Sequence, residues 1–138
     1  MTRRTKLLIG SATALSVVAV IASELGTATT PACAAAAPQI SFAEDIMPIL
    51  RGRCVSCHQP GAEGFEKSGL DLTTYEGVMK GTKHGPMVVP RDPDSSNLIW
   101  LLDWRASPEL RMPHGKKKLS TCDRNDIRNW IREGARNN

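Results

Sequence analysis

The pentapeptide Cys54-Val55-Ser56-Cys57-His58 constrains this chain more than any other feature. Two cysteines three positions apart, followed directly by a histidine, form the attachment site of a c-type haem. Each thiol can add to a haem vinyl group to give a thioether, and the imidazole of His58 can bind the iron. The motif therefore predicts one haem c, bonded covalently through Cys54 and Cys57 and ligated by His58.

Two other roles of a CxxC pair fit the chain less well. A redox-active dithiol is expected in a βαβ context and a reduced compartment, and the sequence offers neither. A zinc site would need two further ligands at finger or ribbon spacing, but the chain has no second CxxC and no HxxxH. Haem attachment remains the prediction.

The N-terminus has the pattern of a signal peptide. Arg3, Arg4 and Lys6 precede an apolar run over residues 7–22, and small residues then cluster at positions 32–37. Alanines at 32, 34 and 36 supply the small-residue pairs of a cleavage site. We expect cleavage near Ala34 to Ala37, which leaves residues 1–36 as signal peptide and residues 37–138 as the mature haem-binding domain.

An uncleaved N-terminal anchor is the alternative. The apolar run is short for a membrane span of about 20 residues, and glycine and hydroxyl side chains interrupt it. Cleavage is therefore favoured over membrane anchoring. This predicts a periplasmic or otherwise exported protein with no membrane span in the mature chain.

Size and charge restrict the function further. The mature part has about 100 residues, the commonest size of one domain. Removing residues 1–36 takes away three basic side chains and Glu24, which lowers the formal charge from +4 to +2. Haem propionates lower it again, which argues against a nucleic-acid partner.

With only six aromatic residues, the chain has little apolar material of its own, so we expect a poorly folded apoprotein.

Helical spacing and capping signals predict about four short helices. Ser41 and Glu44 form a capping box for a helix from about residue 42, with a kink or break at Pro48. Thr73 and Glu76 predict a second helix that Gly81 ends. Two further helices are expected over residues 97–104, capped by Ser95 or Ser96, and between Ser120 and Gly134.

Loops are predicted between these helices. Residues 59–72 are rich in glycine and charge, with Leu70 and Leu72 expected to face inward, and residues 81–95 contain three prolines. The tryptophans at 100, 104 and 130 are interpreted as packing around the cofactor. No alternating strand pattern competes, so the fold class is all-α.

A methionine is the expected sixth ligand of the iron. Met112 stands in a loop between Pro108 and Pro113, and its soft, neutral sulfur would favour the ferrous state and raise the potential. Met47 and Met79, on expected helices, are assigned to core packing. By donor chemistry His114, His84 and Met87 remain alternatives.

Several segments together resemble a known family. They are Ile46-Met47-Pro48-Ile49-Leu50, the Cys54 to His58 motif, Gly69-Leu70-Asp71-Leu72, Arg111-Met112-Pro113, and Trp130-Ile131 with Gly134-Ala135. The chain resembles class I monohaem cytochromes c, and more narrowly the short planctomycete-type cytochrome c domains. The resemblance implies a small all-α cytochrome c-like fold of about four short helices around one haem. It further implies that the first and last helices cross beside the haem, with His58 and Met112 as axial ligands.

Two further features bear on partners. Lys116-Lys117-Lys118, with Arg111 and His114 nearby, forms a basic stretch that could steer an acidic redox partner or could simply be a solvated loop. Cys122 is left over once haem takes two thiols and cleavage removes Cys33. We favour a buried, inert thiol; pairing between chains, or with Cys33 if cleavage fails, is the alternative.

These observations predict an exported electron carrier that is not itself an enzyme and has no catalytic residues. Single electrons would pass through a covalently bound haem with His58 and Met112 on the iron. The alternatives are a haem-based sensor of small ligands and a haem subunit of a larger periplasmic oxidoreductase. Redox proteins are the expected partners of an electron carrier and of a haem subunit.

Overall fold

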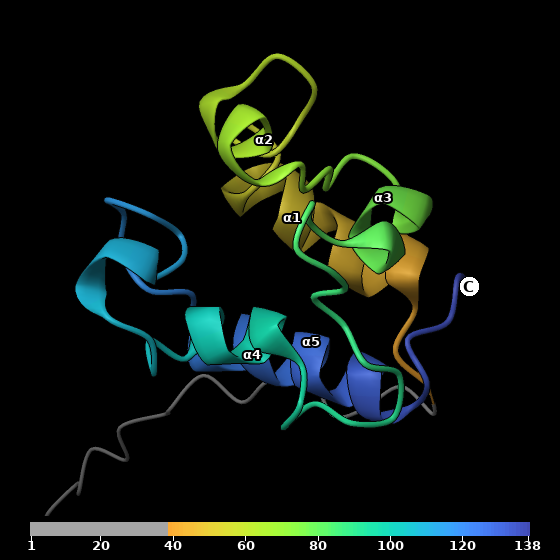
Figure 1. Ribbon diagram of the computed structural model, residues 1–138. Helices are drawn as coiled ribbons and strands as arrows, with labels where there is room; N and C mark the ends of the chain where they lie inside the picture. Colours follow the sequence, from red (N-terminus) through yellow and green to blue (C-terminus); the bar gives the residue numbers. More distant parts are fainter. Residues whose placement is uncertain (1–38) are drawn as a thin grey trace, which may run out of the picture. The chain divides into compact units, whose positions relative to one another are not determined.

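The computed structural model describes residues 39–138. The expected signal peptide, its cleavage region and Cys33 lie outside these residues. The described elements are the π-helix η1 (Phe42–Ile46), α1 (Met47–Arg53), α2 (Glu63–Ser68), α3 (Tyr75–Lys80), α4 (Asn97–Leu102), the 3-10 helix η2 (Pro108–Leu110) and α5 (Thr121–Arg132) (Figure 1). Within residues 39–138 there is no strand beyond the isolated bridge between Thr82 and Gly85, so the all-α prediction is confirmed. No helix among these residues is long and apolar enough to cross a membrane.

The first helical segment begins as the capping signals predict. The Ser41 hydroxyl accepts a hydrogen bond from the Glu44 amide at 3.2 Å, and the Ser41 amide donates to the carboxylate of Asp45 at 2.7 Å. The carboxylate that completes the capping box is therefore that of Asp45 and not, as expected from the sequence, that of Glu44. The helix changes from π to α type at Met47, and Pro48, which has no amide donor, is the second residue of α1.

The interior elements correct the sequence analysis in three places. The segment expected to be one loop over residues 59–72 contains α2, which Gly69 ends in the left-handed conformation at φ 73°. Thr74 caps α3 in place of Thr73. Helix α4 ends at Leu102, two residues earlier than expected. Leu70 and Leu72 are buried, as predicted.

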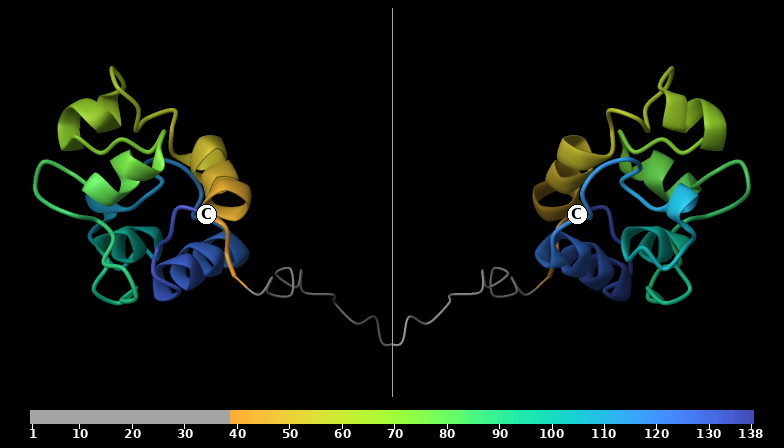
Figure 2. Two further views of the ribbon diagram at one scale, coloured as in Figure 1. Left: turned by 90° about the vertical axis from the view of Figure 1, so that its right-hand side faces the viewer. Right: turned by 90° about the vertical axis from the view of Figure 1, so that its left-hand side faces the viewer.

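The core is built around α5 and η1. Ile127, Trp130 and Ile131 are fully buried on one face of α5, and the Trp130 ring lies 5.4 Å from the ring of Phe42 in η1. The first helical segment and the last helix are therefore in contact. Helices α4 and α5 also lie side by side in the views of Figures 1 and 2 and pack together. Trp130 belongs to this core.

Cys122 stands in the first turn of α5. It is half-buried and disulfide-bonded, so the interpretation as a buried, inert thiol is wrong. Cys54 and Cys57 are the free cysteines of the described part of the chain.

An ion-pair cluster joins the end of α4 to α5. The Asp103 carboxylate accepts hydrogen bonds from Arg124 at 2.7 Å and Arg128 at 2.6 Å, and its side chain is only 15% exposed. Burial acts to raise the pKa of Asp103, but these two hydrogen bonds and the charges of both guanidinium groups outweigh it, and the pKa lies below its ordinary 3.8. The residue after α4 is therefore anchored to the last helix.

We expect Asp103→Asn to lower the free energy of unfolding by about 1–3 kcal/mol, because two partly buried guanidinium groups lose their counter-charge. The folded-state pKa is depressed, so the contribution is complete above the unfolded pKa and is lost as the pH falls through the folded one. Urea unfolding of both proteins between pH 3 and pH 7 measures it. Glu63→Gln, which breaks the exposed Glu63–Lys67 pair, is the control and should leave stability nearly unchanged. A constant difference at all pH values would contradict the electrostatic account.

Candidate functional site

The cysteine–histidine motif forms a tight turn directly after α1. Cys54 caps the helix, and its carbonyl accepts hydrogen bonds from the amides of Cys57 and His58, both at 3.0 Å. Residues three apart on such a turn share one side of the backbone. The turn thus presents a half-buried thiol at Cys54 and an exposed thiol at Cys57, the two groups that haem attachment requires.

The two thiols differ in environment. Burial raises the pKa of Cys54 from 9.0 to about 11, against the opposing effects of the positive charges on Arg53 and Lys116. The reactive form of cysteine is the thiolate. In the folded chain, burial therefore favours the neutral thiol at Cys54 over the thiolate.

The imidazole of His58 has the properties of a metal ligand. Burial lowers the pKa of His58, although the Leu70 carbonyl opposes this effect, so the ring is held in the neutral form that binds metals. Its Nδ1 atom is buried and makes no hydrogen bond of good geometry. A metal-bound histidine normally donates this N–H to a carbonyl or carboxylate. The Leu70 carbonyl is the neighbouring group of that kind, so the chain fits a haem iron bound at Nε2.

Helix α2 forms one wall for His58. A Cβ added at Gly64 would lie 2.7 Å from the Cys57 carbonyl oxygen and 3.0 Å from Cε1 of His58. The Phe65 amide, one residue on, donates to the same Cys57 carbonyl at 3.0 Å. Glycine at 64 thus allows α2 to pack directly against the attachment turn. The glycine-rich composition of residues 59–72 gave no helical period from which this contact could be expected.

We expect Gly64→Ala to lower the free energy of unfolding by about 1–3 kcal/mol, because the backbone carbonyl of Cys57 must move. Gly52→Ala is the matched control: Gly52 also lies in a helix, and nothing lies within 4 Å of its added Cβ. The control should gain about 0.5–1 kcal/mol from lower chain entropy. Urea unfolding of the holoprotein measures both, and a gain in both variants would refute the packing role of Gly64.

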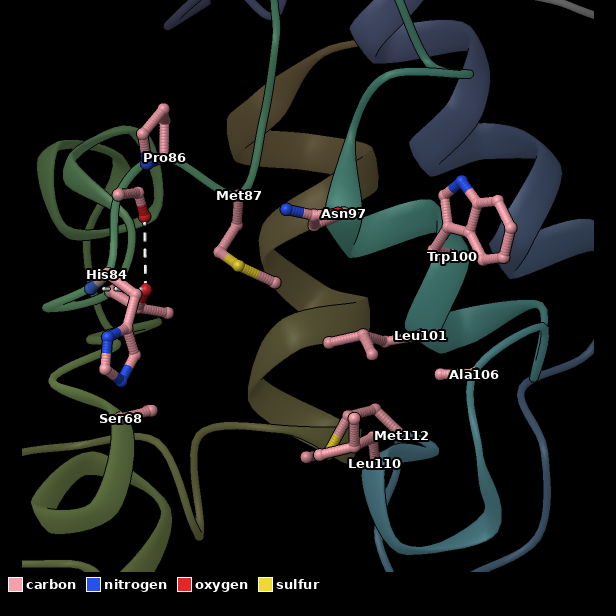
Figure 3. Close-up of a pocket in the computed structure, with 12 residues that line it drawn as sticks. Ser68, His84, Pro86, Met87, Asn97, Trp100, Leu101, Ala106, Leu110 and Met112 are labelled. Atoms are coloured by element: carbon pink, nitrogen blue, oxygen red, sulfur yellow. Dashed lines mark hydrogen bonds between the residues drawn. The ribbon is translucent and has the colours of Figure 1, made fainter.

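A cavity of about 480 Å³ opens beside α4 (Figure 3). Met112, Met87 and His84, three of the four candidates for the sixth ligand, line this cavity together with Trp100, Leu101 and Leu110. Its volume lies in the range of sites that hold organic cofactors. His114 does not line it; this histidine is exposed, and its charge acts on the Glu63 carboxylate.

Residues at the end of α4 form hydrogen bonds with both the amide and the carbonyl of Met112. The Met112 amide donates to the Leu101 carbonyl at 3.2 Å, and the Met112 carbonyl accepts from the indole Nε1 of Trp104 at 2.8 Å. Trp104 has a φ of 62°, a left-handed conformation that costs a residue with a side chain about 1–2 kcal/mol. Nothing in the local sequence pattern indicates that Trp104 and Met112 meet.

The segment after Met112 leads from the cavity to the attachment turn. Arg53, the last residue of α1, donates to the Lys117 carbonyl at 3.0 Å, and the Lys116 ammonium lies 3.5 Å from the Ser56 hydroxyl. Cys54, Cys57 and His58 do not themselves line the cavity. Figure 3 shows α1, which ends at the turn, running behind it.

An all-α fold with a CxxCH turn, a neutral histidine and a methionine-lined cavity defines a c-type cytochrome domain. Residues 54–114, from the first attachment cysteine through the Met112 loop, match the family described as planctomycete cytochrome C. Over these residues the chain is similar to that family, as the resemblance indicated. The family implies haem c and electron transfer. No curated protein and no solved structure matches the chain.

Proposed function

We propose that the protein is an exported electron carrier with one haem c, tethered by Cys54 and Cys57 and ligated by His58 and Met112. The observation that carries the proposal is the arrangement of the two ligands. His58 is a neutral imidazole on the attachment turn, and Met112 lines an apolar cavity from a loop whose next residues contact that turn.

Met112 is preferred over the other donors in the cavity for its backbone contacts. Hydrogen bonds hold both its amide and its carbonyl, whereas the structure gives Met87 a carbonyl bond from the Leu98 amide. His84 is exposed. A donor whose backbone is held on both sides loses less conformational freedom on binding the iron.

Haem c supplies a reversible one-electron change at its iron. The chain's residues set the conditions for that change. Met112 supplies a soft thioether that favours the reduced state, and we propose that the Leu70 carbonyl accepts the Nδ1 hydrogen of His58 and fixes the ring. The apolar side chains of Trp100, Leu101 and Leu110 line the cavity and offer a haem an apolar surface.

Three basic groups beside the attachment turn are proposed to dock an acidic redox partner. They are Arg53, Lys116 and Lys117, and all three are exposed. Arg53 donates to the Lys117 carbonyl, and the Lys116 ammonium lies 3.5 Å from the hydroxyl of Ser56 in the turn. This patch leaves out two cations of the basic stretch seen in the sequence, Lys118 and Arg111. Lys118 donates to the Asp103 carbonyl at 2.6 Å and Arg111 to the Ala106 carbonyl at 3.2 Å, so these two cations serve the fold.

The proposal is tested on the holoprotein from a host that matures c-type cytochromes and exports them. We expect the mass of one haem on the mature chain, one reversible one-electron transition, and the far-red ferric band of methionine ligation. Rapid binding of carbon monoxide by the ferrous protein would instead support a sensor. Stable purification with an oxidoreductase would support a haem subunit.

A further inference from the structure

The C-terminus of α4 has an unusual residue in a common motif. The Trp104 amide donates to the Leu101 carbonyl at 3.2 Å, and the Arg105 amide donates to the Trp100 carbonyl at 3.1 Å. This pair of bonds is the Schellman motif, whose left-handed residue is usually glycine. Here that residue is Trp104, at φ 62°.

A bulky side chain in this conformation is a genuine outlier. Such residues persist where the surrounding structure over-determines them, and they cluster at functional sites. Glycine would close the same motif without strain. The strain at Trp104 therefore indicates that its indole has a specific role.

The indole makes one directed contact with the proposed ligand loop. Its Nε1–H donates to the Met112 carbonyl at 2.8 Å. The same helix end accepts the Met112 amide at the Leu101 carbonyl, at 3.2 Å. Two cations, Arg111 and Lys118, lie 5.7 Å from the centre of the Trp104 ring and hold it in place.

The turn that carries Trp104 is itself fixed. Its neighbour Asp103 is bonded to Arg124 and Arg128 of α5, and the Asp103 carbonyl accepts from Lys118. A continuous set of contacts therefore runs from the last helix through Asp103 and Trp104 to Met112.

We propose that Trp104 is a positioning residue that holds Met112 in place as the sixth ligand of the haem iron. This inference rests on the proposed function, because it requires Met112 on the iron. The left-handed backbone directs the indole at the Met112 carbonyl, and the hydrogen bond restricts the loop so that the thioether competes well against outside ligands.

The test is Trp104→Phe, which keeps an aromatic ring and removes the Nε1–H donor. Trp130→Phe is the matched control, because the Trp130 indole also donates to a backbone carbonyl, that of Arg136, at 2.9 Å, but away from Met112. The readouts are the far-red ferric methionine band and the affinity of the ferric protein for imidazole. We expect Trp104→Phe to weaken the band and to bind imidazole about fivefold more tightly, the factor that one neutral hydrogen bond supplies. The control should leave both readouts unchanged.

A second variant separates positioning from stability. Trp104→Gly relieves the strained backbone and should fold at least as well as the Phe variant, yet it should bind imidazole at least as tightly as Trp104→Phe. Unchanged imidazole affinity in both Trp104 variants, or an equal change in Trp130→Phe, would overturn the inference while leaving Met112 as ligand. A wild-type protein without the methionine band would overturn the ligand assignment and the inference together.

Discussion

Replacing both Cys54 and Cys57 by serine is expected to abolish covalent haem attachment. No thioether can then form, so all haem should be lost from the polypeptide on extraction with acidified organic solvent. Each single variant keeps one thiol and should retain a covalently bound fraction, at lower yield. Mass spectrometry of the denatured chain, and its absorption after extraction, measure the outcome.

The two single variants should differ because their sites differ. Cys54 is half-buried and packs against the core, whereas Cys57 is exposed. Serine at 54 places a hydroxyl against apolar side chains, which costs more than the same change at 57. We therefore expect Cys54→Ser to be the less stable holoprotein. Covalent haem in the double variant would disprove attachment through the motif.

Met112→Ala is expected to remove the far-red methionine band and to lower the midpoint potential by on the order of 0.1 V, because the ferrous state loses its soft thioether ligand. The ferrous variant should also bind carbon monoxide rapidly at the open position. Absorption spectra of both oxidation states and a redox titration measure these effects.

Met87→Ala provides the control for Met112. Met87 lines the same cavity and is also half-buried (Figure 3). Its loss enlarges the cavity by a comparable volume but should leave the band and the potential close to wild type. If Met87→Ala removed the band and Met112→Ala did not, the assignment of the two methionines would be reversed.

The features that sequence analysis predicted well are local ones. The capping bond of Ser41, the glycine that ends α3 and the periodic face of α5 each depend on residues within a few positions of one another. Helix α2 was missed because it has no buried face: none of its residues is buried. Its role is instead a close approach to Cys57 and His58 at one glycine, and that approach has no signature in sequence spacing.

The sequence by itself determined the chemistry of the attachment turn, the all-α class and the cytochrome c resemblance, because these follow from adjacent residues and short periodic patterns. Only the tertiary structure decided which donors share a cavity, that His114 is outside it, and that Lys118 and Arg111 serve the fold. It also decided that Trp104 bonds to the Met112 loop and that Arg124 and Arg128 anchor Asp103. Such contacts join residues from separate elements, and their distances depend on how those elements pack.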